Sequence, residues 1–391
     1  MTQATARPVI SDVSVRVFRT TTALVHDSDG HAHPGEPHTV TRALLTLTDG
    51  DGVRGRCLTA ETHVGEPQLR EHIRPVLLGQ DPFDRERLWQ RLARRQRGSA
   101  GTLGDRALAA VEQALWDLIG SRLGQPVWKL LGGMRDKVPA YASTMCGDET
   151  PGGLATPDDY AAFAEKLVAD GYHAVKLHTW MPPVPFAPSV EQDIRACAAV
   201  REAVGPEVPL MLDANHWYSR SDALRLGRAL DRLDFHWYEE PMEEYSTQSY
   251  RWLAEQLDTP VIGPESVAGR LNARAEWITA HACDILRVGV PTAGGIASAL
   301  RTAHLAEAFG MECEMHGGGA GTLAVLGAVS NSRWYERGLL HPHFDFDAVP
   351  PHLLRATDPV DAEGYVHLSR EPGLGESLDL PYIEAETVRS W

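Results

Sequence analysis

Short apolar segments alternate with amphipathic helical segments from about residue 138 to residue 332, and this alternation constrains the fold more than any other feature of the sequence. The segments expected to be strands are VPAYAST, HAVKLHT, VPLMLDAN, FHWYEEP, PVIGPE, DILRVG and MECEMH. About seven strands joined by crossover helices make a parallel sheet, and closing it into a barrel is the simplest way to bury them. An open doubly wound sheet is the alternative, but no GxGxxG follows the first strand to indicate a dinucleotide site.

The sequence on either side of this repeat has a different pattern. Residues 9–25 and 40–60 alternate as β-strands do, and TDGDGVRG within the second segment is typical of a hairpin turn. Helices are expected near residues 66–78, 82–97 and 105–123. We therefore expect an α+β N-terminal domain (1–135), a barrel (136–335) and an irregular, Pro-rich tail (336–391) that packs back on the N-terminal domain.

Charge and composition narrow the range of partners. The formal net charge of −16 disfavours nucleic acid and anionic membranes, because a polyanion is repelled except at a local basic patch. The sequence has no apolar stretch of 18 residues, and MTQATARPVISDVSV lacks the pattern of a secretory signal. The five cysteines are scattered without a CxxC pair, as in reduced cytosolic proteins. We expect a cytoplasmic protein.

Three of the expected strands end in a carboxylate: Asp213, Glu239 (followed by Glu240) and Glu265. Each follows the previous one by 26 residues, so one βα repeat should place all three at the same height at the C-terminal mouth of a barrel, where catalytic groups lie. Three converging carboxylates repel one another unless a cation neutralises them, and oxygen ligands favour Mg²⁺. The alternative for each residue is a helix N-cap or a surface acid.

The segment GYHAVKLHTW places a cation and an imidazole on one face of a strand. Because side chains alternate along a strand, Lys176 and His178 point the same way, together with Ala174. Two hydrogen-bonded polar groups at a strand end are the alternative to a catalytic pair.

These features together resemble the enolase superfamily, mandelate racemase subgroup, over nearly the whole chain. AAVEQALWDLIGSRLGQPVWKLLGG resembles the last capping-domain helix and its exit, TAGGI resembles the turn after the sixth strand, and EPGLGESLD resembles the C-terminal signature. The resemblance implies a modified (β/α)7β TIM-type barrel with an α+β N-terminal capping domain. It also implies that Asp213, Glu239 and Glu265 bind Mg²⁺, with Glu240 beside Glu239.

The resemblance further implies removal of the proton α to a carboxylate and stabilisation of the enediolate on Mg²⁺. Lys176 matches the first lysine of the family's Lys-x-Lys and is assigned to the substrate carboxylate. His178 replaces the second lysine, the usual base, and an imidazole titrates near neutrality. His316 matches the histidine of the seventh strand, but its usual aspartate partner is replaced by Gly289. His316 therefore suits a general acid that expels a hydroxyl; a core histidine without chemistry is the alternative.

Other residues are candidates for substrate binding. Glu336 matches a position that donates to the substrate carboxylate, although a helix-surface acid is an alternative. Arg287 can fill the space and charge of the missing aspartate or pair with Glu265. Asn215, His216 and Trp180 are expected near the pocket. The His-rich loop 26–38, which includes His31, resembles the family's lid.

The leading hypothesis is an acid-sugar dehydratase that forms a 2-keto-3-deoxy acid. A racemase or epimerase of a small carboxylate is the second hypothesis, because two imidazoles can flank one α-carbon. A binding or scaffold protein without catalysis is the third, based on the lost aspartate. The sequence does not name the substrate; a homo-oligomer is expected from the resemblance.

Overall fold

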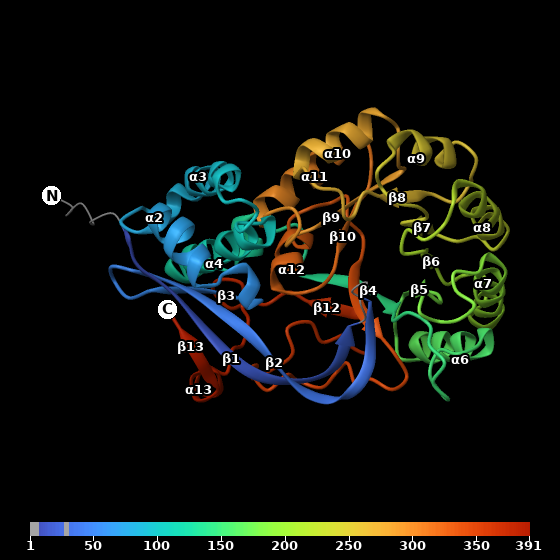
Figure 1. Cartoon of the computed structure of the whole chain (residues 1–391), viewed down its shortest axis with the longest axis horizontal. Helices are drawn as coiled ribbons and strands as arrows, with labels where there is room; N and C mark the ends of the chain where they lie inside the picture. The colour runs from blue at the N-terminus through green and yellow to red at the C-terminus, as the bar shows by residue number, and fades with distance from the viewer. Residues whose placement is uncertain (1–7, 27–30) are drawn as a thin grey trace.

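Eight parallel strands form a nearly closed barrel in the computed structural model, which describes residues 8–26 and 31–391 (Figure 1). The strands are β4 (Lys137–Thr144), β5 (Ala174–His178), β6 (Leu210–Asp213), β7 (Trp237–Glu239), β8 (Val261–Gly263), β9 (Ile285–Gly289), β10 (Cys313–His316) and β11 (Tyr335–Leu340). From β5 to β10 each strand pairs with its predecessor in the chain, and β11 pairs with the free side of β4. The strand order never reverses, so the barrel prediction is confirmed over the doubly wound alternative.

Side chains alternate between the barrel interior and the surrounding helices. Ala174, Met211 and Trp237 belong to the cluster that fills the interior, whereas Val175 and Leu177 pack in the core beneath the helices. The helices on the outside are α6 (Pro157–Ala169), α7 (Val190–Val204), α8 (Arg220–Arg232), α9 (Thr247–Ala254), α10 (Arg270–Thr279), α11 (Ile296–Ala308) and α12 (Ala320–Leu326).

The N-terminal domain is an antiparallel sheet covered by helices on one face. Its strands are β1 (Ile10–His26), β2 (Ala32–Asp49), β3 (Arg54–Thr59) and β13 (Thr387–Ser390), in the order β13-β1-β2-β3. Its helices are α1 (Glu66–Gln68), α2 (Arg74–Leu77), α3 (Arg85–Arg95) and α4 (Asp105–Leu123), followed by α5 (Val127–Leu130). Gly124 ends α4 in the left-handed conformation, at a φ of 63°, which glycine adopts without strain.

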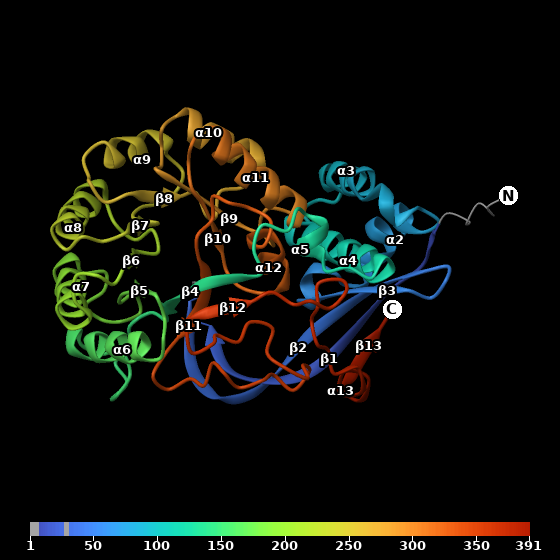
Figure 2. The same ribbon diagram turned by 180° about the vertical axis from the view of Figure 1, so that it is seen from behind.

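The β1–β2 hairpin extends from this domain towards the mouth of the barrel, where its far end lies beside β4 (Figures 1 and 2). We call residues 22–26 and 31–42 the lid hairpin. The expectation of a loop over 26–38 is wrong for the residues that the structure describes, because Val25 pairs with His33 and His26 with Ala32 in the ladder. Residues 27–30 of that predicted loop lie outside the described residues.

The tail contributes to both domains. The predicted boundary between residues 335 and 336 falls inside β11, so the barrel extends to Leu340. Further along, β12 (Tyr365–His367) pairs with β4, and α13 (Leu380–Ala385) leads into β13, which pairs with β1. Within the described residues, every helix is too short or too polar to span a bilayer.

A buried carboxylate fastens the N-terminal domain to the barrel. Glu112 of α4 is 1% exposed and accepts the backbone N–H groups of Ile296 and Ala297 at 2.8 and 3.2 Å, at the N-terminus of α11. Arg85 of α3 lies 2.9 Å from the same carboxylate. A carboxylate at a helix N-terminus is favourable, and its burial makes each of these contacts costly to lose.

Replacing this group should weaken the whole fold. We expect Glu112→Ala to lower the free energy of unfolding by about 3 kcal/mol, because two N–H groups and a guanidinium lose their buried partner. Denaturant unfolding measures the change. The exposed pair Glu86–Arg301 joins the same two regions, so Glu86→Ala is the control and should cost less than about 1 kcal/mol. Equal losses for the two variants would contradict this role for Glu112.

Candidate active site

A cavity of about 330 Å³ lies at the C-terminal ends of the barrel strands, next to the lid hairpin. The residues that line it are His31, Ala32, Cys146, Lys176, His178, Asp213, Asn215, Glu240, Glu265, His316, Gly317, Gly318, Glu336, Gly338 and Leu339. The cavity therefore brings together most of the candidate residues of both the barrel and the lid.

Lys176 is the central cation of this cavity. Its Nζ lies 3.1 Å from Asp213, 3.0 Å from Glu239 and 2.9 Å from Glu336. Burial alone would lower the pKa of Lys176, but the charges of Glu239 and Glu336 outweigh it and hold that pKa well above the usual range. The ammonium group is therefore charged, and three carboxylates hold it at the cavity.

His178 lies beside Lys176 on the same strand face, as the alternation of β5 predicts. Its Nε2 is 3.0 Å from Asp213, while its buried Nδ1 has no hydrogen-bond partner among the described residues. The hydroxyls of Thr144 and Tyr160 bond to the backbone N–H and carbonyl of His178 and fix its position. Because Nδ1 is buried, the ring can reach a ligand only through Nε2, which Asp213 contacts.

The three predicted carboxylates converge, but not at one height. Asp213 pairs with Glu239 across β6 and β7, whereas Glu239 pairs with Ile262 of β8. Glu265 lies three residues beyond Ile262, so the equal spacing did not mean equal register. Gly263 and Pro264 lie between Ile262 and Glu265 and end β8 early. Glu265 therefore reaches the cavity from the loop that follows the strand.

Arg287 is a second buried cation, beneath the cavity floor. It is 0% exposed, and its guanidinium lies 2.7 Å from Glu239, 3.5 Å from Glu265 and 3.0 Å from Glu336. Of the two roles expected for Arg287, the pairing with Glu265 is present, together with two stronger contacts. Arg287 and Lys176 share two partners, Glu239 and Glu336.

Glu239 and Glu240 have different environments, which the sequence did not separate. Glu239 is 0% exposed and accepts hydrogen bonds from Lys176 and from Trp237 Nε1, below the cavity. Glu240 lines the cavity, and its Oε1 is buried without a partner among the described residues. Burial, and then the charges of Asp213, Glu244 and Glu239, raise the pKa of Glu240 well above its usual range.

His316 lies across the cavity at the end of β10. Its Nε2 is 3.0 Å from Glu265, and a Cβ at Gly289 would lie 3.2 Å from its Nδ1. The position of the family's aspartate is therefore beside the ring, and no carboxylate occupies it. The two nearby acidic residues, Asp284 and Glu314, do not replace the aspartate. Asp284 accepts the N–H of Val261, and Glu314 accepts the N–H groups of Arg333 and Trp334.

The charge environment of His316 favours its neutral form. Its side chain is 38% exposed and lines the cavity. Desolvation lowers the pKa of His316 to about 4; the charge of Glu336 opposes this shift, and those of Arg287 and Lys176 add to it.

The remaining candidates separate into two groups. Asn215, Glu336 and His31 line the cavity. Trp180 does not, because its ring is buried against Tyr160 and Phe186 and its Nε1 donates to Leu154. His216 is also absent from the lining and contacts Glu240 from outside, at 3.4 Å.

Cys146, at the end of the first barrel strand, was missed. Asn215 Nδ2 lies 3.7 Å from its sulfur, so the two residues form one wall. Cys146 follows an expected strand by two positions, and neither its residue type nor its spacing indicated a binding site.

The donor set fits a hard divalent cation. Asp213, Glu240 and Glu265 line the cavity with Glu239 directly beneath, and the Oε1 of Glu240 is buried without a hydrogen-bond partner among the described residues. Among the described residues, no three His, Cys, Asp or Glu side chains are already grouped closely enough to hold a metal. Lys176 forms ion pairs with these oxygens and His178 and His316 contact them, so a cation would compete with all three.

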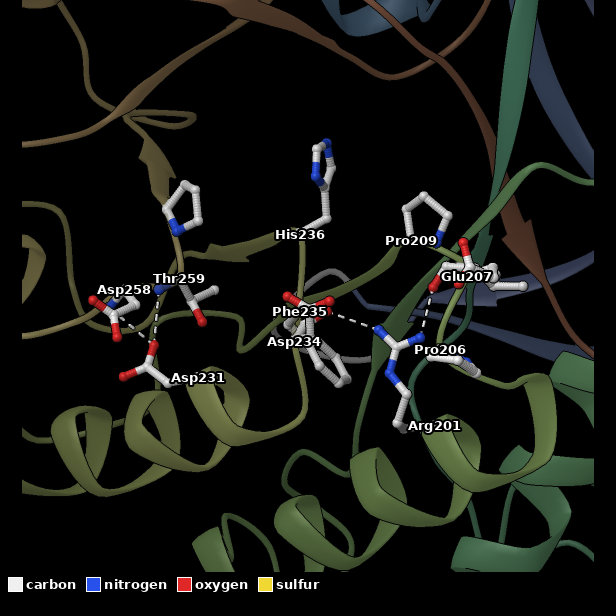
Figure 3. A pocket seen from close by; sticks show the side chains of 12 residues that line it. Arg201, Pro206, Glu207, Pro209, Asp231, Asp234, Phe235, His236, Asp258 and Thr259 are labelled. Atoms are coloured by element: carbon white, nitrogen blue, oxygen red, sulfur yellow. Dashed lines mark hydrogen bonds between the residues drawn. The ribbon is translucent and has the colours of Figure 1, made fainter.

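A separate cavity of about 360 Å³ lies at the opposite end of the barrel strands (Figure 3). Its guanidinium, Arg201, donates to the carbonyls of Leu233, Gly205, Val208 and Asp234. The Asp231 carboxylate accepts the N–H groups of Asp258 and Thr259. These charges hold loops in place, and none of the candidate site residues lines this cavity.

The His316 environment predicts its titration. In the metal-free protein, ¹⁵N NMR of the imidazole should show a neutral ring from pH 8 down to about pH 5.5, because the pKa is lowered. Lys176→Met should raise that pKa, since a nearby positive charge is removed. Lys137→Met, at an exposed pair with Glu363, is the control. Titration of the wild-type ring near its ordinary pKa would contradict the structure.

Comparison with known proteins agrees with this geometry. The family description "Mandelate racemase / muconate lactonizing enzyme, N-terminal domain" matches residues 22–132, and "Enolase C-terminal domain-like" matches residues 159–382. A crystal structure of D-glucarate dehydratase from Agrobacterium tumefaciens complexed with magnesium is 59% identical, with a TM-score of 0.96, over 97% of this chain and 99% of that one.

Curated relatives are more distant. L-talarate/galactarate dehydratase of Salmonella typhimurium is 30% identical over 74% of this chain and 71% of its own length. D-galactarolactone cycloisomerase of Agrobacterium fabrum is 32% identical over 78% and 80%. The barrel, its capping domain and these matches together show that the chain belongs to the enolase superfamily, mandelate racemase subgroup.

Proposed function

We propose that the protein is a Mg²⁺-dependent dehydratase of an acid sugar and that its substrate is a six-carbon sugar diacid of the glucarate type. The observation that carries the proposal is the cavity itself, in which a buried cation, two imidazoles and a set of carboxylates face one another. The relatives named as dehydratases of glucarate and of talarate and galactarate support both the reaction and the substrate class.

Asp213, Glu239 and Glu265 are the residues that would hold magnesium, with Glu240 next to them. When bound, the ion supplies the positive charge that stabilises negative charge developing on the substrate carboxylate. Lys176 binds the same carboxylate from the cavity floor, and Glu336 fixes Lys176 at 2.9 Å. Arg287 neutralises Glu239 and Glu336 from below, which leaves the charge of Lys176 directed at the substrate.

His178 removes the proton from the α-carbon through Nε2, which a cation bound by Asp213 would release. The electron pair of that C–H bond moves onto the substrate carboxylate; its return forms a carbon–carbon double bond as the bond between the β-carbon and its hydroxyl breaks. His316 supplies the proton with which the hydroxyl leaves as water, and the enol becomes the 2-keto-3-deoxy acid. The lowered pKa makes a protonated His316 a strong acid, and the charge of a bound dianion favours its protonation.

A racemase or epimerase is the second candidate, because His178 and His316 line one cavity from different strands. In that reaction one imidazole removes the α-proton and the other returns a proton to the opposite face. The cycloisomerase among the relatives supports an isomerase as the runner-up. A non-catalytic scaffold is the third candidate and has the missing aspartate at Gly289 as its support. A homo-oligomer, a cytoplasmic location and the absence of nucleic-acid and membrane partners stay predictions.

The first test is a screen of sugar acids and diacids with Mg²⁺ in D₂O, followed by proton NMR. We expect a 2-keto-3-deoxy product from a glucarate-type diacid, loss of turnover in EDTA, and recovery when Mg²⁺ is returned. Deuterium at the α-carbon of unchanged acid, without elimination, would transfer the assignment to an epimerase. A protein that neither binds Mg²⁺ nor exchanges any α-proton would leave only the scaffold.

Variants of the two histidines should separate the steps. We expect His178→Gln to lose both α-proton exchange and dehydration, by about 10²–10⁴-fold, because the base is gone. His316→Gln should lose dehydration by a similar factor but retain exchange of solvent deuterium into the substrate. Rates from the same NMR assay measure both. Equal loss of exchange in the two variants would contradict the assignment of base and acid.

A further inference from the structure

A second cavity, of about 820 Å³, lies beneath the lid hairpin and is distinct from the active-site cavity. Its walls are the two arms of the lid hairpin, the chain at the end of β3 and the N-terminal half of α4. The barrel contributes Pro291 to the lining. Pro291 lies two residues beyond Gly289, and Gly289 is the residue that lies beside the His316 ring. The second cavity therefore adjoins the loop that supports the active-site histidine.

The cavity is positively charged in a negatively charged protein. The described residues that line it include Arg42, Arg106 and the histidines 26, 38 and 63, and none of these described lining residues is Asp or Glu. The chain as a whole has 53 acidic residues against 37 Lys and Arg. A cavity whose described charged side chains are all basic, in a chain with an excess of acidic residues, indicates a binding place for an anion.

Arg42 and Arg106 are exposed residues, and neither has a direct counter-ion in the described part of the chain. Neither Arg42 nor Arg106 has a carboxylate oxygen within 4.0 Å in the described part of the chain, whereas Arg85, Arg122 and Arg270 of the same region each form an ion pair. Glu376 acts on Arg42 from further away, and burial raises the pKa of Glu376 to about 7. Near neutral pH this carboxyl is therefore incompletely ionised and offsets only part of the charge of Arg42.

His63 adds to the same cluster. Its Nδ1 lies 2.9 Å from the hydroxyl of Thr59, and burial and then the charge of Arg106 lower its pKa. The neutral ring adds a hydrogen-bonding group to the cluster, and an anion beside Arg106 would favour its protonation.

We infer that Arg42, Arg106 and His63 form a capture site for a small dicarboxylate, from which the acidic substrate passes to the active-site cavity. The inference rests on the proposed function for the identity of the anion. A net charge of −16 repels a dianion from most of the surface. A positive cavity beside the lid reverses that repulsion at the entrance and raises the rate of productive encounter.

Direct binding tests the site without catalysis. Glutarate is a dicarboxylate with no hydroxyl to eliminate, so calorimetry with glutarate, in EDTA and at low ionic strength, reports binding alone. We expect Arg42→Gln and Arg106→Gln to weaken binding by about tenfold or more. Arg228→Gln, at an exposed position on α8, is the matched charge control. Lys176→Met should retain glutarate binding, because the two cavities are separate.

Two binding results would overturn the inference. One is loss of glutarate binding in Lys176→Met with none in the Arg42 and Arg106 variants, which would assign the anion to the active site. The other is inorganic phosphate binding as tightly as glutarate, which would remove the preference for a dicarboxylate. Both results are independent of whether any acid sugar is dehydrated.

Kinetics tests the capture role. With the substrate found in the screen, Arg106→Gln should lower kcat/KM by about tenfold at low salt and leave kcat unchanged. The difference should shrink as salt is added, because screening removes the attraction in both proteins. Wild-type kcat/KM and salt dependence in a variant that no longer binds glutarate would refute capture.

Discussion

Two buried cations hold the active-site end of the barrel together. Lys176 and Arg287 are 1% and 0% exposed, and between them they contact Asp213, Glu239, Glu265 and Glu336. Removing one partner from such a cluster costs several kcal/mol, since it leaves a buried charge uncompensated. The position of each carboxylate, and hence the place for a divalent ion, depends on this arrangement.

Much of the fold could be predicted from the sequence because its signal is local. The periodicities of β4 to β10 and of the helices between them predicted the barrel, and period-2 alternation placed Lys176 and His178 on one face. The eighth strand, β11, was not predicted because YERGLL has little alternation of apolar and polar residues and contains a glycine. The strand pairing of the lid hairpin was not predicted because His33, Pro34 and Gly35 are typical of loops. Long-range pairing with β1 makes this segment a strand.

The site could be predicted only as far as strand ends specify it. Spacing identified the carboxylates, but the early end of β8 at Gly263–Pro264 changed the register of Glu265. The difference between Glu239, below the floor, and Glu240, on the wall, depends on a positive φ of 41° at Glu240, which residue types do not predict. The contacts of Arg287 span four barrel strands, and Trp180 turns away through packing with Tyr160, so neither was visible as a local pattern.

The two strands that pair with β1 in the capping sheet are synthesised far apart in time. β1 pairs with β2 on one side and with β13 on the other, although the whole barrel separates β1 from β13 in the sequence. One edge of β1 therefore stays unpaired on the ribosome until the barrel has been made. Exposed strand edges template aggregation, so this domain, translated first and completed last, is where a chaperone would have most to protect.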